Sequence, residues 1–181
     1  SAPDSPAPLE SWLGHVEGDP LPEDVDLVRR EIARRGTDVP LGVLLRLVER
    51  IREREQAVPS SQQRRWMGAR AAAHVALATR GSRLGVYDLR EALDASREPL
   101  PVEFLAALTL AGDPSCLEPI AAAYTRAAGA HADDWWPRHL ADVFQSIVSR
   151  EGLTRRHAVV KKIDKRWPDA LRALWQTRAT R

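Results

Sequence analysis

The stretch that decides the fold is FLAALTLAGDPSCLEPIAAA, residues 104–123. Its first half is rich in leucine and alanine, which are both strong helix formers. Gly112 is expected to end this helix, and Asp113-Pro114 supplies an N-cap followed by proline at the first helical position. The apolar face of the second helix is carried by Leu117, Ile120 and Tyr124. The stretch therefore predicts two helices joined by a tight turn.

Helical patterning continues on both sides of this stretch. Apolar residues recur at helical spacing from residue 23 onward, and the sequence has neither a sustained period-two alternation nor an Asn-Gly or Asp-Gly hairpin signal. The two clearest stripes are Leu44, Leu47, Val48 and Ile51, and Leu140, Val143, Phe144, Ile147 and Val148. The charged face opposite the first stripe is predicted to be solvated and consists of Arg46, Glu49, Arg50, Glu53 and Arg54. We predict an all-α protein with about 8 to 10 helices.

The N-terminal segment differs in composition from the rest of the chain. Residues 1–22 hold five prolines among serine, glycine and aspartate, which is typical of an extended lead-in segment. Within it, Leu9 and Trp12 begin a short apolar face that predicts one amphipathic turn docked on the domain. Residues 23–181 are predicted to form a single helical-repeat domain. Because the chain begins with serine and holds a single methionine, we expect a processed product or one domain of a longer protein.

The helix–turn–helix pattern recurs along the chain. A shift of 31 residues aligns Gly81-Ser82 with Gly112-Asp113, together with apolar residues on either side. A further shift of 40 residues aligns Phe104 with Phe144. Helix pairs that repeat at periods of about 30 to 45 residues are typical of α-solenoids.

Residues 104–123 resemble a HEAT repeat of the bacterial type, in which an alanine- and leucine-rich helix, Gly-Asp-Pro and a helix with Leu-x-x-Ile spacing follow one another. Residues 76–93 are a poorer copy, with Gly81-Ser82 in place of Gly-Asp-Pro, and residues 140–163 are poorer still. The resemblance extends over residues 65–175. It implies a right-handed α-solenoid of stacked antiparallel helical hairpins whose curved surface mainly binds proteins, and it implies no chemistry.

Charge is unevenly distributed along the chain. The 27 basic and 25 acidic residues give a net charge of +2, which by itself indicates neither a nucleic-acid nor a membrane partner. Residues 155–181, however, hold nine basic and two acidic residues, so this segment carries +7 and the remainder −5. Thr154 is predicted to cap a helix here. On that helix Val159, Val160, Ile163 and Trp167 fall on one side, and Arg155, Lys161, Lys162, Lys165 and Arg166 on the other.

Two interpretations of the basic segment stay open. It is either a cationic strip that binds phosphates or an acidic partner, or the solvated outer face of a terminal repeat. The candidate contacts for a protein partner or a nucleic acid are Arg155, Lys161, Lys162, Lys165, Arg166 and Arg172. Trp135 and Trp136 form a candidate aromatic anchor, because tryptophan is enriched at binding hot spots, or else they pack between helices.

No motif for catalysis, a cofactor or a metal is recognisable. The single cysteine, Cys116, excludes an internal disulfide and a cysteine-cluster metal site, and no histidine lies within a turn to activate it. His131 and His139 lack a second histidine at helical spacing, so a polar loop with Asp134 as N-cap is expected there. Gly-rich phosphate loops, Gly-x-Ser-x-Gly and His-Glu-x-x-His are also missing. We therefore predict no catalytic residue, no cofactor and no metal.

The expected function is binding. No run approaches the roughly 18 apolar residues of a membrane span, and no basic region followed by an apolar run opens the chain, so we expect a cytoplasmic protein without a membrane partner. The leading hypothesis is a non-enzymatic scaffold that binds a protein partner or another domain of its parent chain. The alternative is nucleic-acid binding through the basic C-terminal helix.

Overall fold

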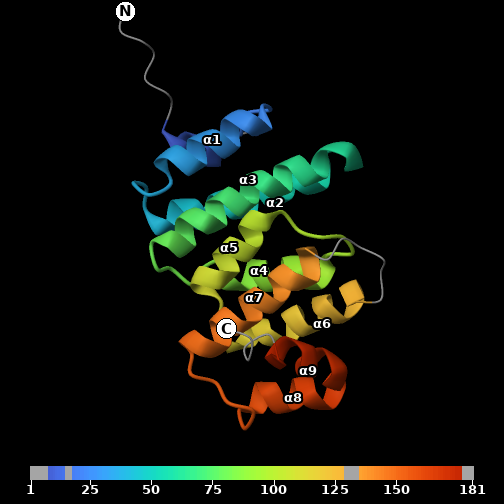
Figure 1. Ribbon diagram of the computed structural model, residues 1–181. Coiled ribbons are helices and arrows are strands. Elements are labelled where there is room, and N and C mark those ends of the chain that lie inside the picture. Colours follow the sequence, from blue (N-terminus) through green and yellow to red (C-terminus); the bar gives the residue numbers. More distant parts are fainter. Residues whose placement is uncertain (1–7, 15–17, 129–134, 177–181) are drawn as a thin grey trace, which may run out of the picture. The chain divides into compact units, whose positions relative to one another are not determined.

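The computed structural model describes residues 8–14, 18–128 and 135–176 (Figure 1). Helices form all the regular structure of these residues and no strand occurs among them, which confirms the prediction of an all-α protein. The contacts divide the chain into two compact units, residues 1–84 and 85–181. A single helical-repeat domain and solenoid stacking stay predictions.

The first unit is built around the longest helix of the part of the chain that the structure describes. Its elements are η1 (Leu9–Leu13, a 3₁₀ helix), α1 (Val25–Arg35), α2 (Leu41–Ala57) and α3 (Ser60–Thr79). Helix α3 packs against both α1 and α2, and η1 packs on α2 (Figure 1). The predicted stripe of α2 is buried, and Leu9 and Trp12 of η1 belong to the same core. The short turn predicted within residues 1–22 is thus confirmed, and it contributes to the core of this unit.

Small residues let α1 and α3 approach each other. Ala69, Ala73 and Ala76 of α3 are buried. A Cβ atom on Gly36, the residue after α1, would lie 2.6 Å from the carbonyl oxygen of Ile32 and 2.8 Å from the Cβ of Ala76. Since real Cβ atoms do not approach so closely, the end of α1 can reach α3 only because residue 36 is glycine.

Arg54 corrects one expectation about the charged face of α2. Its side chain is only 12% exposed. Its guanidinium donates to the carboxylate of Asp19 and to the carbonyl oxygens of Leu21 and Pro22, and it lies 4.9 Å from the ring centre of Trp66. Burial acts to raise the pKa of Asp19, but hydrogen bonds from Arg54 and from the Leu21 N–H hold that pKa below its usual value. An arginine expected in solvent therefore ties the segment before α1 to α2.

A buried ion pair joins α2 to α3. Arg70 donates two hydrogen bonds to Glu55, at 2.5 Å from Nε to Oε2 and 2.9 Å from Nη2 to Oε1. The two side chains are 7% and 10% exposed. Paired N–H···O bonds between a guanidinium and a carboxylate are the strong form of this interaction, so the two helices are linked by a directional contact inside an apolar core.

The second unit surrounds helix α6. Its elements are α4 (Val86–Ala95), α5 (Val102–Ala111), η2 (Pro114–Cys116, a 3₁₀ turn), α6 (Leu117–Ala128), α7 (Trp135–Arg150), α8 (Ala158–Arg166) and α9 (Pro168–Gln176). Helix α6 contacts α4, α7, α8 and α9, and α5 packs on α7. Phe104 of α5 and the whole predicted stripe of α7 are buried in the core of this unit.

The tight turn predicted at Gly112-Asp113-Pro114 forms between α5 and α6. The Asp113 carboxylate accepts a hydrogen bond from the backbone N–H of Ser115, and Pro114 opens the 3₁₀ turn that leads into α6. A Cβ atom on Gly112 would lie 2.6 Å from the Cδ1 atom of Ile147. The glycine therefore both ends α5 and lets that end touch α7.

The start of α8 differs from the prediction. Thr154 accepts a hydrogen bond from the Arg156 N–H through its hydroxyl oxygen, but this caps only a turn. The N-cap of the helix is His157, whose Nδ1 atom accepts from the Val159 N–H. The prediction that Thr154 caps the helix is wrong by three residues, because a local turn uses its hydroxyl before the helix begins.

Candidate interaction site

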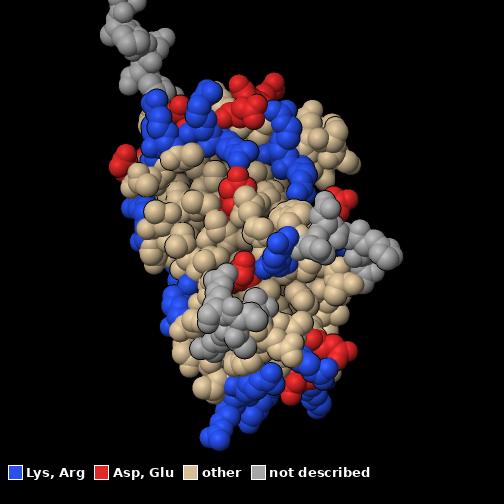
Figure 2. Space-filling model, in the orientation of Figure 1, with Lys and Arg blue, Asp and Glu red and all other residues tan. Residues whose placement is uncertain are grey.

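The predicted basic residues lie on an exposed face formed by α8, α9 and the turn before α8. Arg155 was expected on the same helix as the lysines, but it lies in that turn because α8 begins at Ala158. All six candidates are exposed, namely Arg155, Lys161, Lys162, Lys165, Arg166 and Arg172. Helix α8 turns its apolar side inward, where Val160 and Ile163 are buried. In Figure 2, Lys and Arg atoms gather at the lower end of the view, where Figure 1 places α8 and α9. We call this surface the basic face.

The arginines of the basic face contact other side chains, whereas its lysines do not form ion pairs with described residues. The guanidinium of Arg166 lies 4.4 Å from the ring centre of Trp167, and that of Arg155 lies 5.4 Å from the ring centre of Trp175. Arg172 approaches the carboxylate of Asp169 at 3.7 Å. Lys161, Lys162 and Lys165 form no ion pair with any residue that the structure describes. Of the six candidates, only Arg172 therefore has a described carboxylate partner, and the three lysines have neither a carboxylate nor an aromatic partner among the described residues.

An open groove lies beside the basic face, between α4, α6 and the end of α8. Its volume is about 610 Å³. It is lined by three arginines, three carboxylates and two aromatic residues, together with small residues of η2 and α6. The charged and aromatic residues are Arg90, Arg126, Arg166, Glu91, Asp94, Glu118, Tyr87 and Trp167. We call this feature the mixed-charge groove.

Two contacts hold cations of the groove in place. Arg126 reaches from α6 to α4, where one of its guanidinium nitrogens donates to the carbonyl oxygen of Leu93 at 2.9 Å. The guanidinium of Arg90 lies 5.5 Å from the ring centre of Tyr87, whose side chain is 62% exposed. An arginine beside an exposed aromatic ring is a combination enriched in protein interfaces.

The groove gathers part of the negative charge of the second unit. Residues 85–154 hold eleven acidic and five basic residues, whereas residues 1–84 are nearly balanced, with twelve acidic and thirteen basic. The acidic side chains of α4 and α6 lie in the same groove as the last arginine of α8. The division by sequence into a negative body and a positive end therefore missed that the second unit brings both signs together.

A second, more apolar hollow adjoins the groove. It has a volume of about 400 Å³ and shares Arg166 and Trp167 with the groove. The rest of its lining comes from α6 and α9, namely Tyr124, Thr125, Ala128, Pro168, Asp169, Ala170 and Ala173. Trp167 thus borders both a polar and an apolar recess, a role that the sequence did not suggest for it.

The two tryptophans of the candidate anchor differ in burial. Trp136 is buried and Trp135 is half-buried. Their rings meet edge to face at 5.8 Å, and the ring of Trp135 also contacts that of His139 at 5.4 Å. The burial of Trp136 favours packing over the exposed-anchor interpretation for that residue, while Trp135 reaches the surface in part. His131 and Asp134 lie outside the described residues.

Cys116 has the environment of a core thiol. It is buried, and burial raises its pKa to about 11. A thiol with so high a pKa is protonated at neutral pH and is a poor nucleophile. Within the described residues, no group of three or more His, Cys, Asp or Glu side chains could hold a metal ion. The described helices also include none that combines the length and apolar character needed to cross a bilayer.

Comparison with models of protein families, with curated proteins and with solved structures found no match in any of the three cases. The resemblance to HEAT repeats therefore stays a prediction.

Proposed function

We propose that the second unit is a non-enzymatic interaction domain that binds a protein partner, or another domain of its parent chain, in the mixed-charge groove. The observation that carries the proposal is the open groove of about 610 Å³ in which charged groups of both signs surround the exposed Tyr87 and the half-buried Trp167. The protonated and buried thiol of Cys116 supports a binding role over a catalytic one.

The charges of the groove favour a polypeptide as its occupant. A nucleic acid would bring its phosphates close to Glu91, Asp94 and Glu118, and this like-charge repulsion would oppose binding. A polypeptide carries both signs and can place carboxylates near the arginines and basic side chains near the acids. Complementary charge of this kind fixes the orientation of the bound segment more than it raises affinity.

Photocrosslinking tests the groove directly. The full chain carries p-benzoylphenylalanine either at Ser115, which is exposed in the groove, or at Ser149, which is exposed on α7 outside it. In extract of the cells that make the protein, we expect the Ser115 probe to capture one dominant protein severalfold more efficiently than the Ser149 probe. The captured protein is then purified and its binding to the chain is measured by calorimetry.

A charge reversal provides the control. Arg90→Glu changes the sign of one groove cation beside Tyr87, so we expect it to weaken binding of the captured protein by about tenfold or more. The corresponding reversal outside the groove, Arg138→Glu on α7, is expected to leave the affinity within about twofold. Equal capture from Ser115 and Ser149, or equal effects of the two reversals, contradicts the groove as the binding site.

The basic face favours a second candidate function, nucleic-acid binding. Its three lysines lack described acidic partners, and two of its arginines lie against indole rings. Cations of this kind neutralise phosphates, and binding then weakens steeply with salt because counterions are released. The groove and the basic face are separate surfaces apart from Arg166, so the two functions can be tested independently.

A salt titration tests this second candidate. Binding of a labelled single-stranded and a duplex oligonucleotide is followed from low to physiological salt. Replacing Lys161, Lys162 and Lys165 by glutamine is expected to reduce the slope of log affinity against log salt by about two to three, since each lysine accounts for about one phosphate contact. A control with the same loss of charge replaces Arg30, Arg34 and Arg46, which are exposed in the first unit. No binding at low salt, or equal slopes for the two triple variants, removes this candidate.

A further inference from the structure

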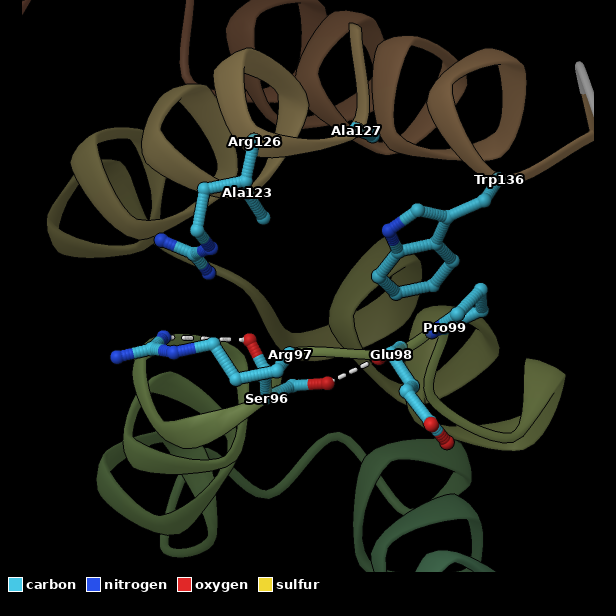
Figure 3. A pocket seen from close by; sticks show the side chains of 8 residues that line it. All are labelled: Ser96, Arg97, Glu98, Pro99, Ala123, Arg126, Ala127 and Trp136. Carbon is cyan, nitrogen blue, oxygen red and sulfur yellow. Dashed lines mark hydrogen bonds between the residues drawn. The ribbon is translucent and has the colours of Figure 1, made fainter. Parts of the chain in front are cut away.

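A small hollow in the second unit is rich in hydrogen-bond donors. It lies between the loop that follows α4, the last turns of α6 and the first turn of α7, and its volume is about 70 Å³. Its lining consists of Ser96, Arg97, Glu98, Pro99, Ala123, Arg126, Ala127 and Trp136 (Figure 3). These residues come from three separate segments, so the hollow exists only in the folded unit.

Trp136 supplies the most informative donor. The residue is only 5% exposed, and Figure 3 shows its indole nitrogen on the side of the ring that faces Arg126 across the hollow. No residue that the structure describes accepts a hydrogen bond from this N–H. An indole N–H can only donate, so this nitrogen offers a donor to any acceptor that enters the hollow. The orientation of the ring therefore lets this N–H donate to a group bound in the hollow.

Two guanidinium groups add positive charge. Arg126 is held by its hydrogen bond to the carbonyl oxygen of Leu93, which uses one of its five N–H groups. Arg97 donates to the carbonyl oxygen of Asp94 at 3.3 Å and to that of Ser96 at 3.5 Å. Both side chains thus keep donors for a ligand. Arg126 is held by a short bond to the backbone, whereas Arg97 is exposed and makes only long contacts to it.

Two other polar side chains of the lining bond within the loop or face elsewhere. The hydroxyl of Ser96 donates to the carbonyl oxygen of Glu98. Figure 3 shows the Glu98 side chain, the one carboxylate among the described residues of the lining, pointing away from the space between Arg126 and Trp136. Among the described residues of its lining, the hollow therefore combines two positive charges with an indole donor, and the Glu98 carboxylate points away from it.

We propose that this hollow binds a single oxyanion group, a phosphate or a carboxylate. Guanidinium groups bind both in a forked geometry, and the indole N–H adds a third direction of donation. A water molecule needs roughly 10 to 15 Å³ of such space, so about 70 Å³ holds a group of about four or five heavy atoms. The site goes beyond the proposed function, since a free anion could fill it as well as an acidic or phosphorylated side chain.

The indole N–H of Trp136 reports binding at the site itself. In a ¹⁵N-labelled sample of the full chain, six tryptophans give six indole resonances, and Trp136→Phe identifies the one from Trp136 by its loss. The sample is titrated with inorganic phosphate at constant ionic strength, with chloride as the replaced anion. We expect the Trp136 resonance to move and saturate while the other five stay nearly still.

Variants of the two arginines make the result specific. Arg126→Gln is expected to weaken phosphate binding by about tenfold or more, because it removes one charge-assisted contact. Arg97→Gln is the second variant, because loss of the Arg126 contact to Leu93 can disturb the fold. Arg138→Gln, an exposed arginine of α7 outside the hollow, is the control and should leave the titration unchanged. Each variant is first checked by its circular dichroism.

Two capped amino acids distinguish the sources of the anion. N-acetyl-phosphoserine amide and N-acetyl-aspartate amide carry the group on a peptide unit, and tighter binding of either than of phosphate and acetate assigns the site to a side chain. Equal or weaker binding assigns it to a free anion. A shift shared by all six indole resonances, or a Trp136 shift that survives both Arg126→Gln and Arg97→Gln, overturns the site without affecting the proposal for the groove.

Discussion

Replacing Glu55 by glutamine is expected to lower the free energy of unfolding by about 3 to 5 kcal/mol. The change keeps the shape of the side chain and removes its charge, so the buried guanidinium of Arg70 loses the carboxylate that holds it at 2.5 and 2.9 Å. A buried charge without its counterion is far more costly than the loss of an exposed pair. Urea unfolding followed by circular dichroism measures the difference from the midpoint and slope.

Glu53 on the same helix is the matched control. It pairs with Arg50 at 2.9 Å, but its side chain is 66% exposed, so Glu53→Gln is expected to cost less than about 1 kcal/mol. Replacing Glu55 and Arg70 together by methionine should restore most of the lost stability, because neither charge of this pair is then left buried without its counterion. If Glu55→Gln is as mild as Glu53→Gln, the ion pair does not stabilise the first unit.

Raising the pH to about 11 is expected to remove about 2 kcal/mol of stability through Cys116 alone. The pKa of this thiol is about 11 in the folded chain against 9.0 for an unperturbed thiol, because burial disfavours the thiolate. A folded pKa that lies above the unfolded one stabilises the fold below the unfolded value. That contribution is lost as the pH rises through the folded value, here between about pH 9 and 11.

The Cys116→Ala variant isolates this effect from other groups that titrate in the same range. Stability is measured by urea unfolding of the variant and the unchanged chain at pH 8, 9, 10 and 11. The alanine variant lacks the thiol, so the stability difference between the two proteins should shrink by about 2 kcal/mol in favour of the variant. A difference that is the same at every pH would show that the thiol ionises as readily folded as unfolded.

Local patterns in the sequence were sufficient to predict the helices. The stripe that includes Phe144 could be assigned because one buried face imposes the same spacing on every turn. The turn at Gly112 and Asp113 could be assigned because both residues act on their immediate neighbours. Thr154 shows the limit of such reasoning, since a hydroxyl near a helix start can serve a preceding turn instead.

Contacts between distant residues could not be predicted in the same way. Arg54 appeared on a charged helical face, yet its partner Asp19 lies 35 residues earlier and buries it. Glu55 and Arg70 are 15 residues apart on different helices, so no spacing rule connects them. Which charged side chain leaves solvent is decided by packing between elements, and a single sequence does not contain that information directly.

The candidate site was predictable only as far as it lies on one helix. The part of the basic face that holds Lys161, Lys162, Lys165 and Arg166 could be drawn from helical spacing, because these four residues lie on α8 alone. The mixed-charge groove combines side chains of α4, α6 and α8 that are up to 80 residues apart, from Tyr87 to Trp167. An exposed tyrosine opposite the apolar stripe of α4 was the one local signal that pointed to it.

Arg126 lines both the groove and the small hollow beside Trp136. Ligands that share one guanidinium are thermodynamically linked, because the side chain that one of them orders is the side chain that the other must contact. If an anion in the hollow changes the affinity of the groove for its partner by some factor, the partner changes the affinity of the hollow for the anion by the same factor. If both proposed sites bind their ligands, a small ion in the hollow will modulate the capture of a much larger molecule in the groove.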